Sequence, residues 1–344
     1  MSEVSWLRKL QRRAFPRGRP DCIQVGLYRS ASRLIAARVR LDAGAGSTVE
    51  QFQTVAIGMQ RDEEAFRRLI QSGIFSGAQV ILALGPEQYN TYPVTAPSVP
   101  EAELNEALRW QLRELLPYAP EDAVIAAIRL VRAEDASTPQ NLLVVAAQRR
   151  TVAHVVSPLV SAGIAVMAVD IPEMAQRNLL ATLPGSDSGQ ALLSLDQESG
   201  LFTVIKQAEL CFARRIQMPR SNALEEEDPE HIAVRVATQV QRSVEVVERQ
   251  TGLAPIQTIW IGPHPYAALI ARCTAEQTGI DCPQLDLPSE VRFACAVPDL
   301  DPEAAAGALL AIGAALRVDE ADVPRHPGLS ADSLSWLTRH EAAA

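Results

Sequence analysis

The sequence predicts an α/β protein built from two similar halves, with a small α+β subdomain inserted into the first half. Apolar and polar residues alternate through three consecutive segments near the start of the chain, and the same pattern returns after residue 190. In both halves a helical pattern and a short apolar run follow. The chain has 344 residues, of which 47% are hydrophobic, so it can form the two or so substantial cores that this plan requires.

The first half opens with three predicted antiparallel strands. Residues 23–27, 34–39 and 52–57 alternate with a period of two and are separated by short polar or glycine-containing stretches. A helix is expected from Asp62 to Gly73, and the apolar run 79–84 suits a buried strand.

The inserted subdomain is predicted over residues 86–150. Its helix begins at Glu101, ends at Pro117, and is followed by strand-like runs at 124–131 and 142–147. Four leucines are expected to form one buried stripe on this helix: Leu104, Leu108, Leu112 and Leu115.

The first half then resumes and leads to a hinge. A helix over 155–162 is closed by Gly163, a strand covers 164–169, and Pro172 opens another helix at its first turn. The Gly- and Ser-rich stretch 184–189 is typical of a linker.

The second half repeats the order of the first. Strands are predicted over 191–195, 201–206 and 209–217, and a long helix begins with Asp228 as its N-cap and Pro229 at its first position. The remaining elements are a strand over 257–261, a helix over 265–277, a short strand over 284–287 and an Ala-rich helix over 302–317.

These elements predict a division of the chain into domains and tails. The ranges are a basic tail 1–20, a first domain 21–85 plus 151–185, the insert 86–150, a second domain 190–317 and a C-terminal tail 318–344.

Charge and cysteine content exclude several classes of function. A net charge of −9 argues against nucleic-acid binding, which requires a surplus of Lys and Arg. The five cysteines are an odd number without a C-x-x-C pair, so we expect reduced thiols and no metal site. No apolar run reaches the roughly 18 residues of a membrane span, and charges interrupt the start of the chain where a signal peptide would be apolar. We therefore expect a cytoplasmic protein.

The basic tail has an amphipathic character that suits a lipid surface. Trp6 is interleaved with Arg8, Lys9, Arg12 and Arg13 on an otherwise acidic protein. Such a segment can lie on anionic lipid, where each basic residue contributes on the order of 1 kcal/mol. The alternative is a solvated tail.

The repeated order of strands and helices is the plan of the actin-like (ribonuclease H-like) superfamily, and several segments resemble the PilM family of type IV pilus assembly. The resemblance covers residues 21–317 and includes the inserted 1C-type subdomain. The segments shared with the family are 106–122, 142–148, 169–172 and 307–317. Two more, 209–216 and 239–245, resemble the branch of the family that serves the mannose-sensitive haemagglutinin (MSHA) pilus.

The resemblance implies a nucleotide cleft, but its first phosphate turn departs from the family pattern. An actin-fold ATPase places a carboxylate beside glycine there, to hold hydrated magnesium. The turn after Gly26 has none; Ser30 and Ser32 can donate to a phosphate, or can be ordinary hairpin-turn residues.

The other nucleotide motifs depart as well. The Asp-x-Gly of the second phosphate turn falls on Ser194 and Asp196, unless a shift of two residues makes Asp196 the acid. The Gly-Gly adenosine loop retains only Gly262. Asp170 stands where a catalytic-side acid can lie, or is an ordinary helix N-terminal residue. We therefore expect a pseudo-ATPase without ATP or magnesium as a cofactor.

The resemblance further implies a scaffold that binds the cytoplasmic tail of a PilN-like bitopic membrane protein. Trp110, Pro117 and Tyr118 are the candidate contacts, because Trp110 falls off the leucine stripe. The alternative is that all three pack the insert. Two other functions stay open: a divergent ATPase that holds magnesium with Asp196 and Asp170, and a cytoplasmic component of type II secretion of the GspL kind.

Overall fold

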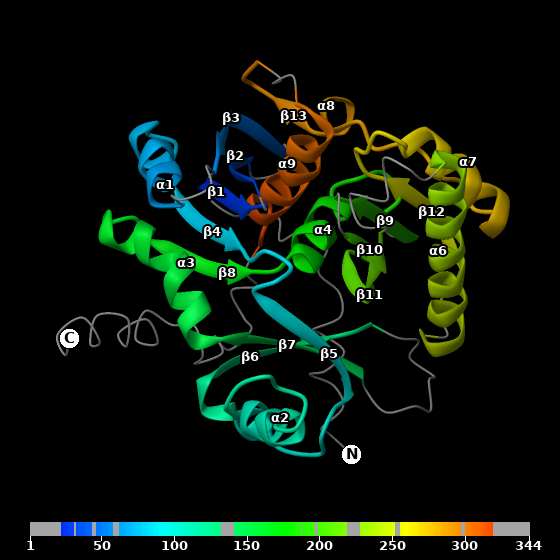
Figure 1. Ribbon diagram of the computed structural model, residues 1–344, viewed down its shortest axis with the longest axis horizontal. Coiled ribbons are helices and arrows are strands. Elements are labelled where there is room, and N and C mark those ends of the chain that lie inside the picture. Colours follow the sequence, from blue (N-terminus) through cyan, green and yellow to red (C-terminus); the bar gives the residue numbers. More distant parts are fainter. Residues whose placement is uncertain are drawn as a thin grey trace.

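The computed structural model describes residues 22–30, 32–42, 46–57, 62–131, 141–186, 188–196, 199–218, 228–251, 255–296 and 300–318. Two sheet-and-helix halves lie side by side above the small inserted subdomain, and helices α4 (Pro172–Leu180) and α9 (Pro302–Ala315) lie between the halves (Figure 1). The segments of the basic tail and of the C-terminal tail from residue 319 fall outside the described residues.

The first half is a mixed sheet with the strand order β13-β3-β2-β1-β4-β8. Its strands are β1 (Cys22–Arg29), β2 (Arg33–Asp42), β3 (Gly46–Ala56), β4 (Gln79–Ala83), β8 (Val166–Asp170) and the short β13 (Arg292–Phe293). The first three form the predicted antiparallel meander, and β4 and β8 add to β1 in parallel. Helices α1 (Asp62–Gln71) and α3 (Arg149–Ser161) pack against each other and share a core with the sheet.

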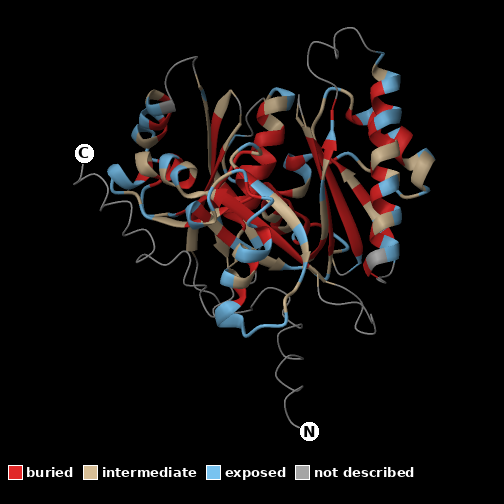
Figure 2. Ribbon diagram, turned by 60° about the horizontal axis from the view of Figure 1, so that its bottom comes forward, coloured by how far each residue is buried: buried red, intermediate tan, exposed pale blue. Residues whose placement is uncertain are grey.

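The second half repeats this topology with the strand order β11-β10-β9-β12. The strands are β9 (Gly189–Leu195), β10 (Ser199–Lys206), β11 (Glu209–Gln217) and β12 (Ile256–Ile261), of which β12 is parallel to β9. Helices α6 (Pro229–Thr251) and α7 (Ala267–Thr278) pack together over one face. Buried and exposed residues alternate along α6 (Figure 2), as expected for a helix that packs one apolar stripe against the sheet.

The inserted subdomain is a three-stranded antiparallel sheet covered by one helix. The strand order is β5-β7-β6, with β5 (Tyr89–Thr95), β7 (Asn141–Gln148) and β6 (Ala123–Arg129). Helix α2 (Leu104–Leu112) packs on it, preceded and followed by 3-10 turns at Glu101–Glu103 and Pro120–Asp122. Strand β5 was not predicted, because Pro93 interrupts its pattern. Proline has no backbone N–H, but β5 lies at the edge of the sheet, where Pro93 does not need to donate a ladder hydrogen bond.

The two halves meet where α9 crosses β1 and α4. A Cβ atom at Gly26 of β1 would lie 1.9 Å from the carbonyl oxygen of Ala311, and one at Gly313 would lie 2.1 Å from that of Ala175 in α4. Both clashes involve backbone atoms, so only glycine allows the helix to lie this close to the sheet and to its neighbour. The amide of Asn178 also donates to the carbonyl oxygen of Gly313, over 3.0 Å.

Three expectations differ from the structure. Residues 284–287 form no strand: Gln284 makes one isolated bridge to β12, and Leu287 begins the short helix α8 (Leu287–Glu290), because Pro288 cannot supply a ladder N–H. Leu115 is 60% exposed, since α2 ends at Leu112 and Leu116 takes the inward position. Helix α9 packs against β1 and β2, although the predicted boundary 190–317 gave it to the second half.

No helix within the described part of the chain is long and apolar enough to cross a membrane.

We predict that Gly26→Ala destabilises the protein by about 3 kcal/mol, the upper end of the usual cost of overpacking, because the new methyl group meets the backbone of α9 and cannot be accommodated by a rotamer change. The measurement is urea unfolding followed by circular dichroism. Gly163→Ala is the comparison: that glycine has φ +72° with open space around it, so only the cost of the left-handed conformation, roughly 1–2 kcal/mol, is expected. Equal losses in the two variants would contradict the packing argument.

Candidate functional site

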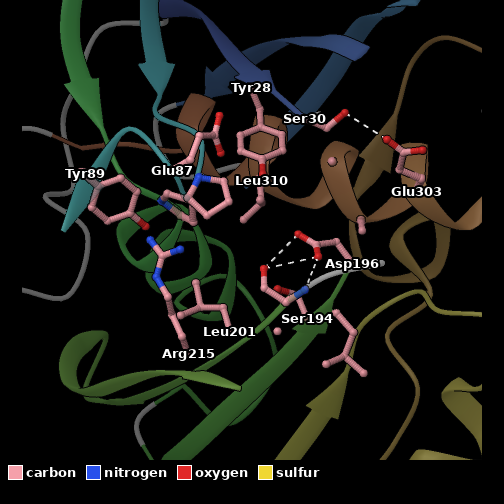
Figure 3. Close-up of a pocket in the computed structure, with 17 residues that line it drawn as sticks. Tyr28, Ser30, Glu87, Tyr89, Ser194, Asp196, Leu201, Arg215, Glu303 and Leu310 are labelled. Carbon is pink, nitrogen blue, oxygen red and sulfur yellow. Dashed lines mark hydrogen bonds between the residues drawn. The ribbon is translucent and has the colours of Figure 1, made fainter. Parts of the chain in front are cut away.

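A cavity of about 170 Å³ opens between the two halves, beside the ends of β1 and β9. Figure 3 shows Tyr28 and Ser30 from the first half facing Ser194, Asp196 and Arg215 from the second. The first turns of α9 and the start of β5 complete the wall. The cavity therefore lies where the resemblance places the phosphates of a nucleotide.

The first phosphate turn is occupied by a carboxylate of the protein itself. Glu303, in the first turn of α9, accepts hydrogen bonds from Ser32 Oγ over 2.5 Å and from Ser30 Oγ over 3.2 Å (the latter drawn in Figure 3). The hydroxyl groups that the sequence offered to a phosphate are thus already bonded to an anion. A phosphate at this turn would meet a negative charge, so these residues do not fit a bound triphosphate.

Ser194 and Asp196 lie together on the opposite wall. Ser194 Oγ accepts a hydrogen bond from Nε2 of the buried Gln176 in α4. Asp196 lies in the β9–β10 turn, where its carboxylate accepts from the backbone N–H of Ser199 over 2.6 Å and from the Ser199 hydroxyl over 3.2 and 3.3 Å. This is an Asx-type turn, the usual structural use of aspartate in a hairpin.

Asp170 is an ion-pair partner and does not line the cavity. Its side chain is 5% exposed; Oδ2 accepts from Arg317 Nη1 over 2.9 Å and Oδ1 from the N–H of Ile171. Asp170 thus binds Arg317, two residues past the C-terminal end of α9, while Ser30 and Ser32 bind Glu303 at the N-terminal end. The helix has 14 residues and so spans roughly 21 Å, and the predicted site residues do not converge on one point.

Gly262 lines a second hollow, of about 220 Å³, with Pro263, His264 and residues before and within α9. Pro302 and Ala305 face this hollow, whereas Glu303 and Ala306 face the first cavity, so the start of α9 stands between the two. The glycine itself serves packing: its N–H donates to Leu193 O over 2.8 Å, and a Cβ would lie 3.2 Å from the same oxygen.

A buried polar cluster that the sequence did not reveal joins the halves to the insert. Tyr89 of β5 donates from its hydroxyl to Glu173 Oε2 over 2.6 Å, and the Arg215 guanidinium of β11 lies 4.9 Å from the centre of the Tyr89 ring. Glu173 is 1% exposed, and burial raises its pKa. Burial also raises the pKa of Tyr28 and Tyr89. In the sequence, Glu173 is an acidic residue in the first turn of a helix, which is a common position for glutamate. Only its tertiary contacts show that it is buried and bonded to Tyr89.

The cavity wall combines charged side chains and serines with tyrosine and aliphatic side chains. Three carboxylates and one guanidinium reach it: Glu87, Asp196, Glu303 and Arg215. Glu87 lies 3.6 Å from Arg29, and the other two acids bind serines as described. Among the residues that the structure describes, no three His, Cys, Asp or Glu side chains gather into a metal-binding group.

The candidate partner residues differ in exposure. Trp110 is 63% exposed on α2 with the Arg113 guanidinium 5.9 Å from its ring centre, and Pro117 is also exposed. Tyr118 is half-buried against the leucine core of the insert, and burial raises its pKa to about 12. Trp110 and Pro117 are therefore accessible, while Tyr118 mainly packs the subdomain.

We predict that Glu173 makes stability fall with rising pH. A folded-state pKa above the unfolded value, about 4.5, means that the unfolded chain ionises first. The contribution of Glu173 is thus complete below about pH 4.5 and is lost as pH rises to its raised folded pKa, at up to about 1.4 kcal/mol per pH unit. Glu173→Gln keeps an acceptor for Tyr89 and does not titrate.

Urea unfolding at a series of pH values tests this expectation. As pH rises, the unfolding free energy of wild type should fall relative to that of Glu173→Gln. Glu106→Gln, an exposed glutamate in the first turn of α2, makes the same charge change and should retain the wild-type profile. Parallel profiles for wild type and Glu173→Gln would contradict the assignment.

Comparisons with protein families and with solved structures show what this chain is similar to. The family model described as type IV pilus assembly protein PilM matches residues 49–221. The solved PilM-PilN type IV pilus biogenesis complex is 16% identical with a TM-score of 0.63, over 86% of this chain and 98% of that one. At this identity the likeness shows the fold, and the predicted actin-like architecture is confirmed.

Two further solved structures are more distant. The cytoplasmic domain of EpsL, an inner-membrane component of the type II secretion system of Vibrio cholerae, is 12% identical over 85% of this chain and 94% of that one, with a TM-score of 0.46. An actin-like ATPase-fold protein of unknown function from Bacteroides thetaiotaomicron is 7% identical over 76% and 90%, with a TM-score of 0.44. No curated protein sequence matches significantly. Because the family model covers half of the chain and the fold agrees with it, the chain belongs to the PilM family of type IV pilus assembly proteins.

Proposed function

We propose that the protein is a scaffold of the inner-membrane assembly platform of a type IV pilus, without ATPase activity, and that it binds the cytoplasmic tail of a PilN-like bitopic membrane protein. Membership of the PilM family supports a role in type IV pilus assembly, and the similarity to the PilM-PilN complex supports a PilN-like protein as the partner. The protein would act on the cytoplasmic face of the inner membrane, with the basic segment around Trp6 against lipid.

The observation that carries the scaffold proposal is the exposure of Trp110. Trp110 is 63% exposed, so most of its apolar surface can be buried only by a binding partner. Tryptophan is one of the residue types enriched among binding hot spots. Leu115 is similarly exposed on the same subdomain, and Arg113 adds a positive charge beside the Trp110 ring. These side chains suit an extended or helical peptide with apolar anchors.

The state of the nucleotide cleft supports the absence of hydrolysis. Glu303 takes the serine hydroxyls of the first turn, Asp196 serves its own hairpin, and Asp170 pairs with Arg317. The cavity of about 170 Å³ is also smaller than the roughly 300–1,000 Å³ of typical ligand pockets. A phosphate at the first turn would require the bonds between Glu303 and the two serines to be broken.

A more specific assignment is to the MSHA pilus, in a role similar to that of MshI. Its support is the sequence of β11 and of the middle of α6, which resemble that branch of the family.

We predict that Trp110→Ala lowers affinity for the partner's cytoplasmic tail at least tenfold, the loss expected for a hot-spot residue. Fluorescence anisotropy of a labelled tail peptide measures it. Val234→Ala, which shortens a side chain 42% exposed on α6, is the matched control and should bind as wild type does. Equal affinity of wild type and Trp110→Ala would remove Trp110 from the interface.

We also predict no binding of Mg-ATP in the micromolar range by isothermal titration calorimetry, because the cleft acids and serines are already paired. Micromolar binding that Asp196→Asn abolishes would contradict the proposal and favour a divergent ATPase.

A further inference from the structure

The contact between Glu303 and the β1–β2 turn joins residues 271 and 273 positions apart in sequence. Ser32 Oγ makes the shorter bond, 2.5 Å, and Ser30 Oγ the longer one, 3.2 Å, to the same carboxylate oxygen. Since the two hydroxyl groups converge on one oxygen, the turn binds this carboxylate as it would bind one oxygen of a phosphate.

The turn is held ready for such an oxygen by its own hydrogen bonds. Ser30 Oγ accepts from the N–H of Arg33 over 3.0 Å and of Ser32 over 3.3 Å, and its hydroxyl donates to Arg33 O over 3.4 Å. The backbone N–H of Ser30 donates to Arg33 O over 2.9 Å. The single Ser30 hydroxyl hydrogen can be donated to Arg33 O or, over the shorter distance of 3.2 Å, to Glu303.

Helix α9 places Glu303 there rigidly. Asp301 caps the helix through the N–H of Ala304 over 2.8 Å and also binds Arg33 Nη2 over 2.5 Å, which ties the first turn of the helix to β2. Pro302 occupies the first helical position. A carboxylate in the first turn of a helix also interacts favourably with the helix dipole.

We infer that Glu303 is a built-in oxyanion that occupies the first phosphate turn in place of a ligand and thereby excludes phosphate from it. The inference rests on the proposed loss of nucleotide chemistry and gives it a specific cause. Glu303 is then the residue that determines which ligands this turn can bind. When Glu303 is removed, the turn should bind a small tetrahedral or planar oxyanion.

The test uses the full-length protein with inorganic phosphate as the probe, at constant ionic strength. Glu303→Ala should lower the melting temperature by a few degrees, because two hydroxyl groups lose their acceptor. Phosphate should then restore at least half of that loss in a saturable manner, as measured by differential scanning fluorimetry. Wild type should show no such response, because the carboxylate already fills the turn.

Two variants separate this effect from general stabilisation by salt. In Ser30→Ala/Ser32→Ala/Glu303→Ala the donors are absent, and phosphate should restore nothing. Glu106→Ala removes a first-turn glutamate that is exposed on α2 and should respond as wild type does. If Glu303→Ala does not fold, Glu303→Ser, whose short side chain also vacates the turn, serves in its place, with calorimetric phosphate binding as the readout.

The inference is overturned if phosphate shifts Glu303→Ala no more than wild type, or shifts all variants alike. The proposed function fails differently, through micromolar Mg-ATP binding by wild type or peptide binding that ignores Trp110. Because Glu303 lies in the cleft and Trp110 on the insert, Glu303→Ala should retain wild-type affinity for the peptide.

Discussion

The close crossing of α9 with β1 and α4 is the constraint on which the rest of the structure depends. At Gly26 and Gly313 the backbone of one element lies where a side chain would otherwise be. Helix α9 therefore lies flat on the first sheet, while α4 packs on it and also contacts β10, β9 and β11 of the second half. The largest buried cluster follows this crossing and contains residues of both halves. The two halves are thus joined by a shared core as well as by a linker.

This crossing also determines what the cleft contains. Because α9 is fixed along its length, its first turn projects between the cavity at the phosphate turns and the hollow at Gly262, and Arg317, two residues past its end, binds Asp170. The helix therefore brings Glu303 to Ser30 and Ser32, and the segment that follows it brings Arg317 to Asp170. Ser30, Ser32 and Asp170, three of the predicted cleft residues, are thus bonded to residues at the start of this helix and just beyond its end.

The insert is tied to this centre by buried polar contacts. Tyr89 leads into the insert and binds Glu173 at the start of α4, and Arg215 from the second half covers its ring. A buried carboxylate with a raised pKa is costly unless it is hydrogen-bonded, so the cluster favours one relative position of the three parts. The exposed Trp110 and Pro117 are then presented on a subdomain whose attachment is well defined.

The sequence by itself determined the element order, the duplicated halves and the insert, because period-two alternation and helix signals at Pro172, Asp228 and Pro229 are local. The absence of a carboxylate next to Gly26 can also be read directly from the sequence. Strand β5 was missed because Pro93 is tolerated only at an edge, and which strand forms the edge is a property of the sheet. The tertiary structure alone decided that Leu115 faces solvent, that α9 lies on the first sheet, and that Glu303 fills the turn of Ser30 and Ser32. These outcomes depend on contacts between residues far apart in sequence, which no local pattern encodes.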